Sequence, residues 1–177
     1  MTLLKLVYNF FTKSAINEGV FELYKKCVAQ ARLPAFYQKG VPDTVEGRFD
    51  LILLHVYLVM RRLHIHKKEN QQLFDLMFGD MDRSLREMGV GDMSIRKKMG
   101  PMISAFYGRS KAYEDAIDNN DLVLATTLKR NLLGKDSLNE ALLQKLASYV
   151  RETIIKLDSQ NDLALLSGQI DFVEPVL

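Results

Sequence analysis

The run LILLHVYLVM, at positions 51–60, is apolar in every residue except one histidine. Arg61 and Arg62 follow it directly. A helix that crosses a bilayer needs about 20 apolar residues, so this run is too short to span a membrane. It predicts instead a helix buried at the centre of a globular fold.

Apolar residues recur at three- and four-residue spacing along almost the whole chain of 177 residues, which is the period of an α-helix. No segment shows the alternation of a β-strand beside a hairpin turn. We therefore predict an all-α fold: one domain over residues 1–177, a single compact helical bundle of about seven or eight helices. Besides an apolar face that ends near Phe11, the expected helices cover about 15–32, 43–66, 70–88, 92–107, 110–118, 121–133 and 137–157, and an extended tail covers about 169–177.

Local signals set the expected helix ends. Asp43 has the spacing of an N-cap residue for the 43–66 helix, and Ser137 has that spacing for the 137–157 helix. The glycines at 89 and 91 predict a sharp turn with unusual backbone angles at both positions. Asp92 is the expected N-cap of the next helix, and Gly100-Pro101 predicts an interruption in it.

Charge is distributed unevenly along the chain. Residues 1–113 hold 18 Lys and Arg against 11 Asp and Glu, whereas residues 114–177 hold 6 against 11. This asymmetry favours a face that meets an anionic surface, such as ribosomal RNA or phospholipid. The alternative is that the basic runs are ordinary solvated helix faces.

Motifs for catalysis or cofactor binding are absent from the sequence. It contains no P-loop, no dinucleotide-binding glycine pattern and no nucleophile elbow. His55, His64 and His66 do not share the i, i+4 face of a helical metal site, so we expect no metal and no cofactor. We read His55 as a hydrogen-bonded interior residue and Cys27, the single cysteine, as a buried thiol in a reducing compartment.

Six of the eight methionines fall between positions 77 and 102, among several arginines and lysines. Flexible thioethers suit surfaces that accept varied apolar partners, although methionine also fills helical cores. Spacing on the helix also predicts two ion pairs here, Asp82 with Arg86 and Arg83 with Glu87.

Three segments, KGVPDTVEGRFDLILLHVYLVMRRL (39–63), LFDLMFGDMDRSLREMGVGD (73–92) and KKMGPMISAFYGRSKAYEDAI (97–117), resemble the ubiquinol–cytochrome c chaperone family. The string REMGVGD followed by AFYGR carries the resemblance most specifically. The resemblance implies a non-enzymatic factor that holds newly made cytochrome b and assists assembly of respiratory complex III.

Mitochondrial members of that family act with a small partner protein near the ribosomal tunnel exit. The resemblance therefore implies the ribosome and a small partner protein as further candidate partners, and the uneven charge adds an anionic membrane surface. The chain is similar to a compact bacterial-type member, which implies a cytoplasmic location, peripheral at the inner face of the inner membrane.

From these lines together we predict a client-binding surface that combines apolar anchors with basic residues. Two other functions stay open: a helical enzyme with an unrecognised site, and a basic RNA- or ribosome-binding module. The residues predicted for the client surface are Met81, Arg83, Arg86, Met88, Arg96, Lys97, Lys98, Phe106, Tyr107 and Arg109.

Overall fold

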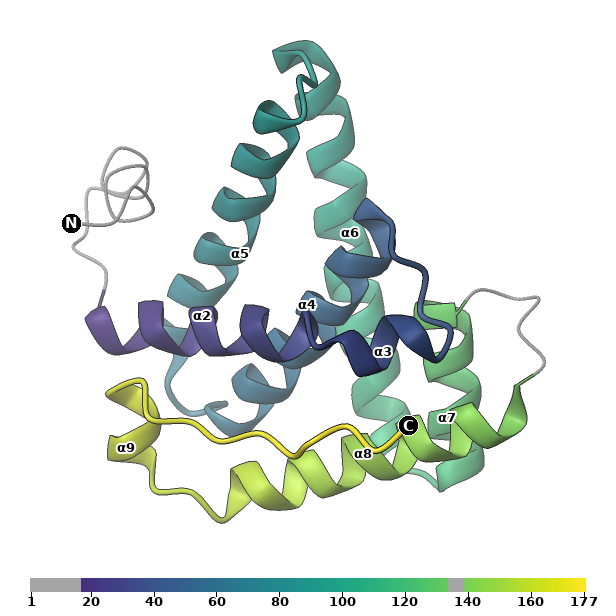
Figure 1. Ribbon diagram of the computed structural model, residues 1–177. Helices are drawn as coiled ribbons and strands as arrows, with labels where there is room; N and C mark the ends of the chain where they lie inside the picture. The colour runs from purple at the N-terminus through teal and green to yellow at the C-terminus, as the bar shows by residue number, and fades with distance from the viewer. Residues whose placement is uncertain (1–16, 134–138) are drawn as a thin grey trace.

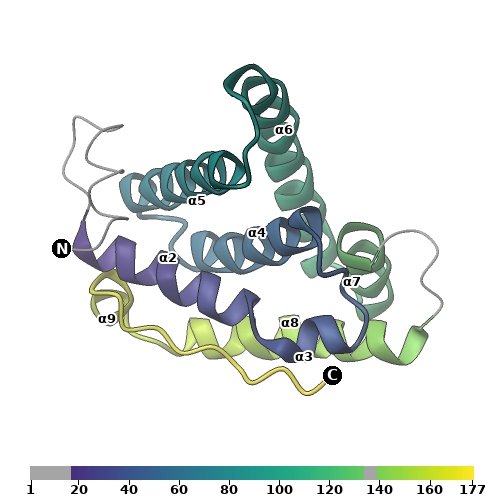
Figure 2. The ribbon, with the colours of Figure 1, turned by 45° about the horizontal axis from the view of Figure 1, so that its top comes forward.

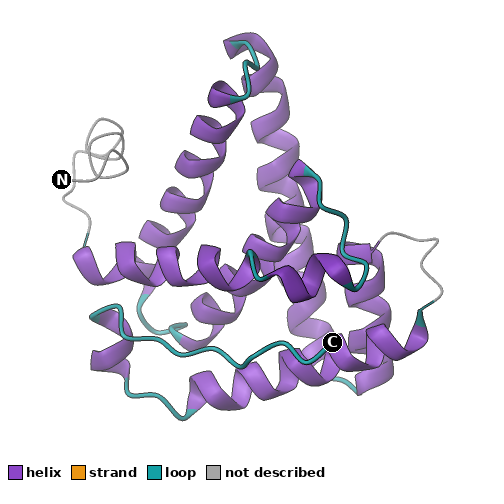
Figure 3. Cartoon of the chain, viewed as in Figure 1, coloured by secondary structure: helices purple, strands orange, loops and turns teal. Residues whose placement is uncertain are grey.

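A computed structural model describes residues 17–133 and 139–177 (Figure 1). These residues form helices joined by loops, and no strand occurs among them (Figure 3). The all-α prediction is confirmed; the apolar face near Phe11 and the Ser137 cap lie outside the described residues. The elements are α2 (Glu18–Ala31), α3 (Pro34–Gln38), α4 (Val45–Arg62), α5 (Lys67–Glu87), α6 (Asp92–Ile117), α7 (Asp121–Leu128), the π-helical turn η1 (Lys129–Leu133), α8 (Glu140–Asp158) and α9 (Asp162–Leu166).

Helix α4 forms the centre of the fold, as its apolar run predicted. Every residue from 49 to 59 is buried, and α4 packs against α2, α5, α6 and α8. The expected N-cap was wrong by one residue. Thr44 is the cap, because its hydroxyl accepts a hydrogen bond from the Gly47 amide at 3.1 Å, whereas Asp43 accepts one from Arg48 at 2.6 Å.

The C-terminal end of α4 is fixed by side chains from other segments. It ends at Arg62 rather than at the predicted His66, because the Asn70 amide donates hydrogen bonds to the carbonyls of Met60 and Leu63 at 3.0 and 3.1 Å. These bonds satisfy carbonyls that would otherwise lack a partner at a helix end. The chain then turns directly into α5.

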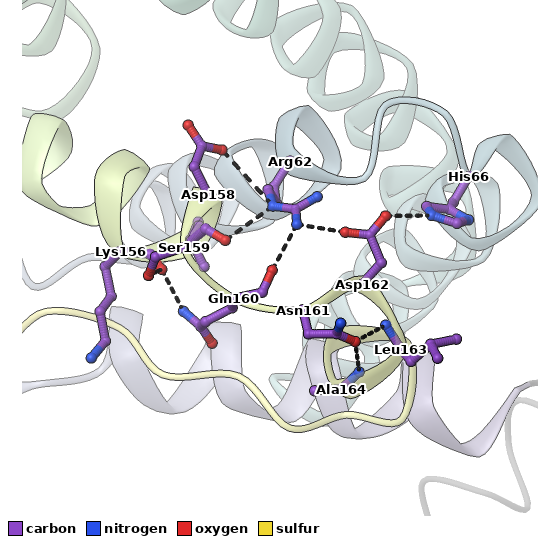
Figure 4. A network of polar contacts seen from close by, with 11 residues as sticks. Arg62, His66, Lys156, Asp158, Ser159, Gln160, Asn161, Asp162, Leu163 and Ala164 are labelled. Carbon is purple, nitrogen blue, oxygen red and sulfur yellow. Dashed lines mark hydrogen bonds and ion pairs between the residues drawn. The ribbon is translucent and has the colours of Figure 1, made fainter.

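Arg62 joins three helices at the same place (Figure 4). Its guanidinium donates to the carbonyls of Leu157 and Gln160 at the end of α8, at 3.0 and 2.7 Å, and to the Asp162 carboxylate at the start of α9, at 2.5 Å. Several charge-assisted hydrogen bonds from one guanidinium fix geometry well. The contact therefore anchors α8 and α9 on the central helix.

Helices α5 and α6 form a hairpin that projects from the rest of the bundle (Figures 1 and 2). At its tip the amide of Val90 donates to the Leu85 carbonyl at 3.0 Å, and Gly89 has a φ of 81°. This is the glycine-terminated end common to helices. The prediction for the second glycine was wrong: Gly91 has a φ of −69° and takes the N-cap position of α6 expected for Asp92.

We expect Gly89→Ala to lower the free energy of unfolding by about 1 kcal/mol, because a left-handed φ is costly for a residue with a Cβ. Gly91→Ala is the matched control, since its backbone angles suit alanine and open space surrounds both glycines. Urea unfolding of the two variants checks this. Equal stabilities would contradict it.

Helix α6 runs without interruption to Ile117, so the predicted break at Gly100-Pro101 was wrong. A residue before proline normally leaves the helical region because its Cβ clashes with the proline ring. Glycine at position 100 has no Cβ and removes that clash. Pro101 is exposed, where water can satisfy the carbonyl that loses its helical donor.

The tail after α9 is extended, as predicted, and lies between α2 and α8 (Figure 1). Gln30 of α2 donates to the Val173 carbonyl at 2.7 Å. Gln160 both donates to the Asp171 carbonyl and accepts from the Asp171 amide, each at 2.9 Å. Apolar tail side chains pack on the core, so the tail is an integral part of the bundle.

Candidate functional site: the α5–α6 hairpin

All ten predicted client-binding residues lie on the hairpin of α5 and α6. The structure divides them into three groups: side chains packed in the core, arginines held in ion pairs, and side chains that are exposed without an ion pair. Only the third group offers a surface to a partner.

Met81 and Phe106 belong to the core. They are 8% and 3% exposed, and the Phe106 ring packs edge-on against Phe74 and Phe78 with centroids 5.2 and 5.9 Å apart. Helical spacing alone cannot separate such packing residues from surface anchors. Neither side chain is placed to contact a client.

Arg83 and Arg86 form the ion pairs that their spacing predicts. Arg83 lies 3.7 Å from Glu87 and also contacts Asp80, whose carboxylate accepts from the Tyr24 hydroxyl at 2.8 Å. Arg83 thus helps to join α5 to α2.

Across the hairpin turn, Arg86 lies 2.7 Å from Asp82 on its own helix and also contacts Asp92 at the start of α6. These contacts tie the two helices together at the turn, so Arg86 supports the shape of the tip.

Arg109 is the third paired arginine. It contacts the Asp50 carboxylate of α4, a side chain that is only 10% exposed. Burial raises the pKa of Asp50, and the positive charge of Arg109 opposes that rise. Arg109 therefore anchors α6 to the central helix.

The remaining predicted cations, Arg96, Lys97 and Lys98, are exposed and make no ion pair with any described residue. We call these three residues the basic turn. Met88 and Tyr107 are 53% and 61% exposed, as a client surface requires.

Sequence reasoning did not select Met93 for the client surface, yet it is 69% exposed, one turn of α6 before Lys97. Its position among the clustered methionines was a signal, but the helical period could not show which of them face outwards. The hairpin thus presents unpaired cations beside exposed apolar side chains.

An open hollow of about 740 Å³ lies at the C-terminal end of α4. It is lined by Arg61, Arg62, His64, Glu114 and Asp158. Its carboxylates lie near its arginines, Glu114 3.7 Å from Arg61 and Asp158 3.9 Å from Arg62. These pairs connect α4 to α6 and α8, which gives the charged side chains a structural use.

His55 is a hydrogen-bonded interior residue, as predicted. Its Nδ1–H donates to the Leu51 carbonyl at 2.7 Å, and its Nε2 accepts from the Tyr149 hydroxyl at 2.8 Å. Burial lowers the pKa of His55 to about 4 and raises that of the buried Cys27 thiol well above its usual range. Over residues 17–133 and 139–177, no cluster of His, Cys, Asp and Glu has a metal-binding arrangement.

Within the part of the chain that the structure describes, none of the helices has both the length and the hydropathy that a membrane span requires.

Known proteins are similar to this chain in sequence, and a solved structure is similar to it in fold. The frog (Xenopus laevis) ubiquinol–cytochrome c reductase complex assembly factor 1 is 26% identical over 90% of the chain and 83% of its own length. The human protein of that name is 28% identical over 92% of the chain, but the chain spans only 56% of it. The crystal structure of the Cbp3 homolog from Brucella abortus superimposes with a TM-score of 0.80 at 35% identity, covering 96% of this chain and 97% of the other.

The sequence model of the family described as ubiquinol–cytochrome C chaperone matches residues 38–172. This match takes in the α5–α6 hairpin, the central helix and the first residues of the extended tail. The resemblance seen in three sequence segments therefore holds for most of the chain, which belongs to the ubiquinol–cytochrome c chaperone family.

Proposed function

We propose that this chain is a non-enzymatic assembly factor of ubiquinol–cytochrome c reductase that binds newly made cytochrome b through the exposed part of the α5–α6 hairpin. The observation that carries the proposal is the basic turn beside exposed Met88, Met93 and Tyr107. Apolar burial supplies affinity for a membrane-protein client, and exposed cations orient its charged loops.

We further propose that the protein works in the cytoplasm, peripherally at the inner face of the inner membrane. One fact supports this: the solved relative from Brucella abortus, 35% identical over 96% of this chain, comes from a bacterium. The ribosome near its tunnel exit and a small partner protein stay candidate partners, since the unpaired cations of the basic turn also suit ribosomal RNA.

The test is the charge-reversal set Arg96→Glu, Lys97→Glu and Lys98→Glu in the full chain. Glu is as good a helix former as Lys and Arg, so helicity and melting temperature are expected to stay nearly unchanged. Capture of cytochrome b from detergent-solubilised native membranes should fall at least tenfold. Complex III in cells should fall with it, and wild-type capture should weaken as salt is raised.

A matched control reverses three exposed lysines elsewhere that also make no ion pair with described residues, Lys26→Glu, Lys145→Glu and Lys156→Glu. It changes net charge equally but leaves the hairpin intact, so capture should be kept. If the basic-turn variant folds and captures cytochrome b as well as this control does, the proposal is wrong.

A further inference from the structure

One face of α6 is exposed over its first five turns. Helix α6 packs on α4, α5 and α7 mainly through its opposite side, where Ile95 and Phe106 are buried. At the edge of the exposed face, the Tyr107 ring also packs on Phe74 of α5, with centroids 5.7 Å apart. The outward residues share one face by their three- and four-residue spacing, and all are exposed. We call this set the α6 outer face: Met93, Arg96, Lys97, Gly100, Ser104, Tyr107 and Gly108.

The charge of the α6 outer face indicates the class of partner. No acidic residue occurs between positions 93 and 113, and Arg96 and Lys97 make no ion pair with a described residue. The other arginines of the hairpin, in contrast, have carboxylate partners within the chain. Arg96 and Lys97 are thus left to pair with carboxylates that a partner brings.

The shape of the α6 outer face further limits the class of partner that fits it. Between the cations and Gly108 the centre carries only small side chains, and a Cβ added at Gly108 would meet nothing within 4 Å. Glycine within a helix costs about 1 kcal/mol relative to alanine, and Gly108, unlike Gly100, precedes no proline. No contact with residues 17–133 or 139–177 therefore requires glycine at position 108.

A flat centre lets a second backbone approach closely, as it does where helices pack on small residues. A lipid surface would instead gain from long apolar side chains at the centre of the face. Met93 is free to contact one side of a helix that lies along this centre, and the exposed part of the Tyr107 ring, which Phe74 holds in place, can contact the other.

We infer that the α6 outer face seats an α-helix of the client, with acidic side chains of that helix beside Arg96 and Lys97. The inference rests on the proposed function and adds that the client presents an α-helix with acidic side chains. Apolar contact with Met93 and Tyr107 supplies affinity, and the two cations set the direction in which the helix lies.

The test is Gly108→Leu, alone and with Ser104→Leu, in the full chain. Leucine has the higher helix propensity at both exposed positions, so the melting temperature should hold or rise. Capture of cytochrome b should fall at least tenfold, because the added side chains fill the space that a docked helix needs. If the leucine variants fail to fold, Gly108→Ala gives the smaller loss expected from one added methyl group.

The matched control is Gly79→Leu, because Gly79 is an exposed mid-helix glycine of α5 that also has nothing within 4 Å. This variant should gain the same helix propensity and keep full capture. If it loses capture equally, the α6 outer face is not the docking site.

Two results separate this inference from the proposed function. Normal capture by the leucine variants, with capture lost on reversal of the basic turn, overturns helix docking and leaves the proposed function standing. If neither the leucine variants nor the basic-turn variant loses capture, both the inference and the proposed function are wrong. In cosedimentation with phosphatidylglycerol vesicles, tighter binding of the leucine variants would show that the face meets lipid instead and would also overturn the inference.

Discussion

Replacing Arg109 with alanine is expected to lower the free energy of unfolding by about 3 kcal/mol, the lower end of the range for breaking a buried ion pair by removing one partner, because the Arg109 side chain is 27% exposed. The Asp50 carboxylate would stay buried in α4 without the cation that compensates its charge. Arg86→Ala is the control, because that guanidinium is 47% exposed and solvent screens its ion pairs, so its loss should cost clearly less than the loss of Arg109. Urea unfolding of both variants gives the comparison.

The Arg109→Ala defect should also depend on pH. Without Arg109, nothing opposes the effect of burial, so the pKa of Asp50 rises further. A group with a raised folded-state pKa binds protons more readily in the folded protein, so the variant regains stability as pH falls through that pKa. The gap to wild type should therefore be smaller at pH 5 than at pH 8. Adding Asp50→Asn should restore part of the loss at pH 8. A gap that widens in acid would contradict this account.

The second large effect is acid destabilisation through His55. The unfolded chain protonates this imidazole below its ordinary pKa of 6.5, whereas the folded protein resists protonation until about pH 4. The free energy of unfolding should therefore fall as pH drops from 6.5 to 4. At 1.36 kcal/mol per pKa unit, this difference amounts to about 3 kcal/mol.

Urea unfolding of wild type and His55→Gln between pH 7 and pH 4 isolates the contribution of His55, because the other titrating groups cancel between the two proteins. Over that window the variant should lose about 3 kcal/mol less than wild type does. His64→Gln is the control, since His64 is exposed. It should follow the wild-type curve. Parallel curves for all three proteins would show that His55 is not the cause.

The sequence predicted features that local spacing determines. The apolar run of α4 indicated a central helix, and i, i+4 spacing indicated the pairs of Arg83 with Glu87 and Arg86 with Asp82; both pairs are present. Methionines clustered among arginines and lysines indicated a candidate surface that lies on the α5–α6 hairpin. These features depend on residues within a few positions of one another.

Features that depend on distant partners could not be predicted in this way. The ion pair of Arg109 could not be predicted from the sequence, because its partner Asp50 lies 59 positions away. Met81 and Met88 look alike by composition, yet one is 8% and the other 53% exposed, because α2 and α4 pack against the body of α5 and not against its tip. The break expected at Pro101 is absent because Gly100 has no Cβ to clash with the proline ring.

The extended tail bears on how the protein folds during synthesis. The hydrogen bond from Gln30 to Val173 joins residues 143 positions apart, and the Phe172 ring packs on the His55 ring with centroids 5.5 Å apart. The interior around His55 therefore closes only after every helix has been translated. Non-local closure of this kind slows folding. Until then the apolar central helix is only partly covered, so the chain passes through a stage during synthesis at which its own core is exposed to other chains.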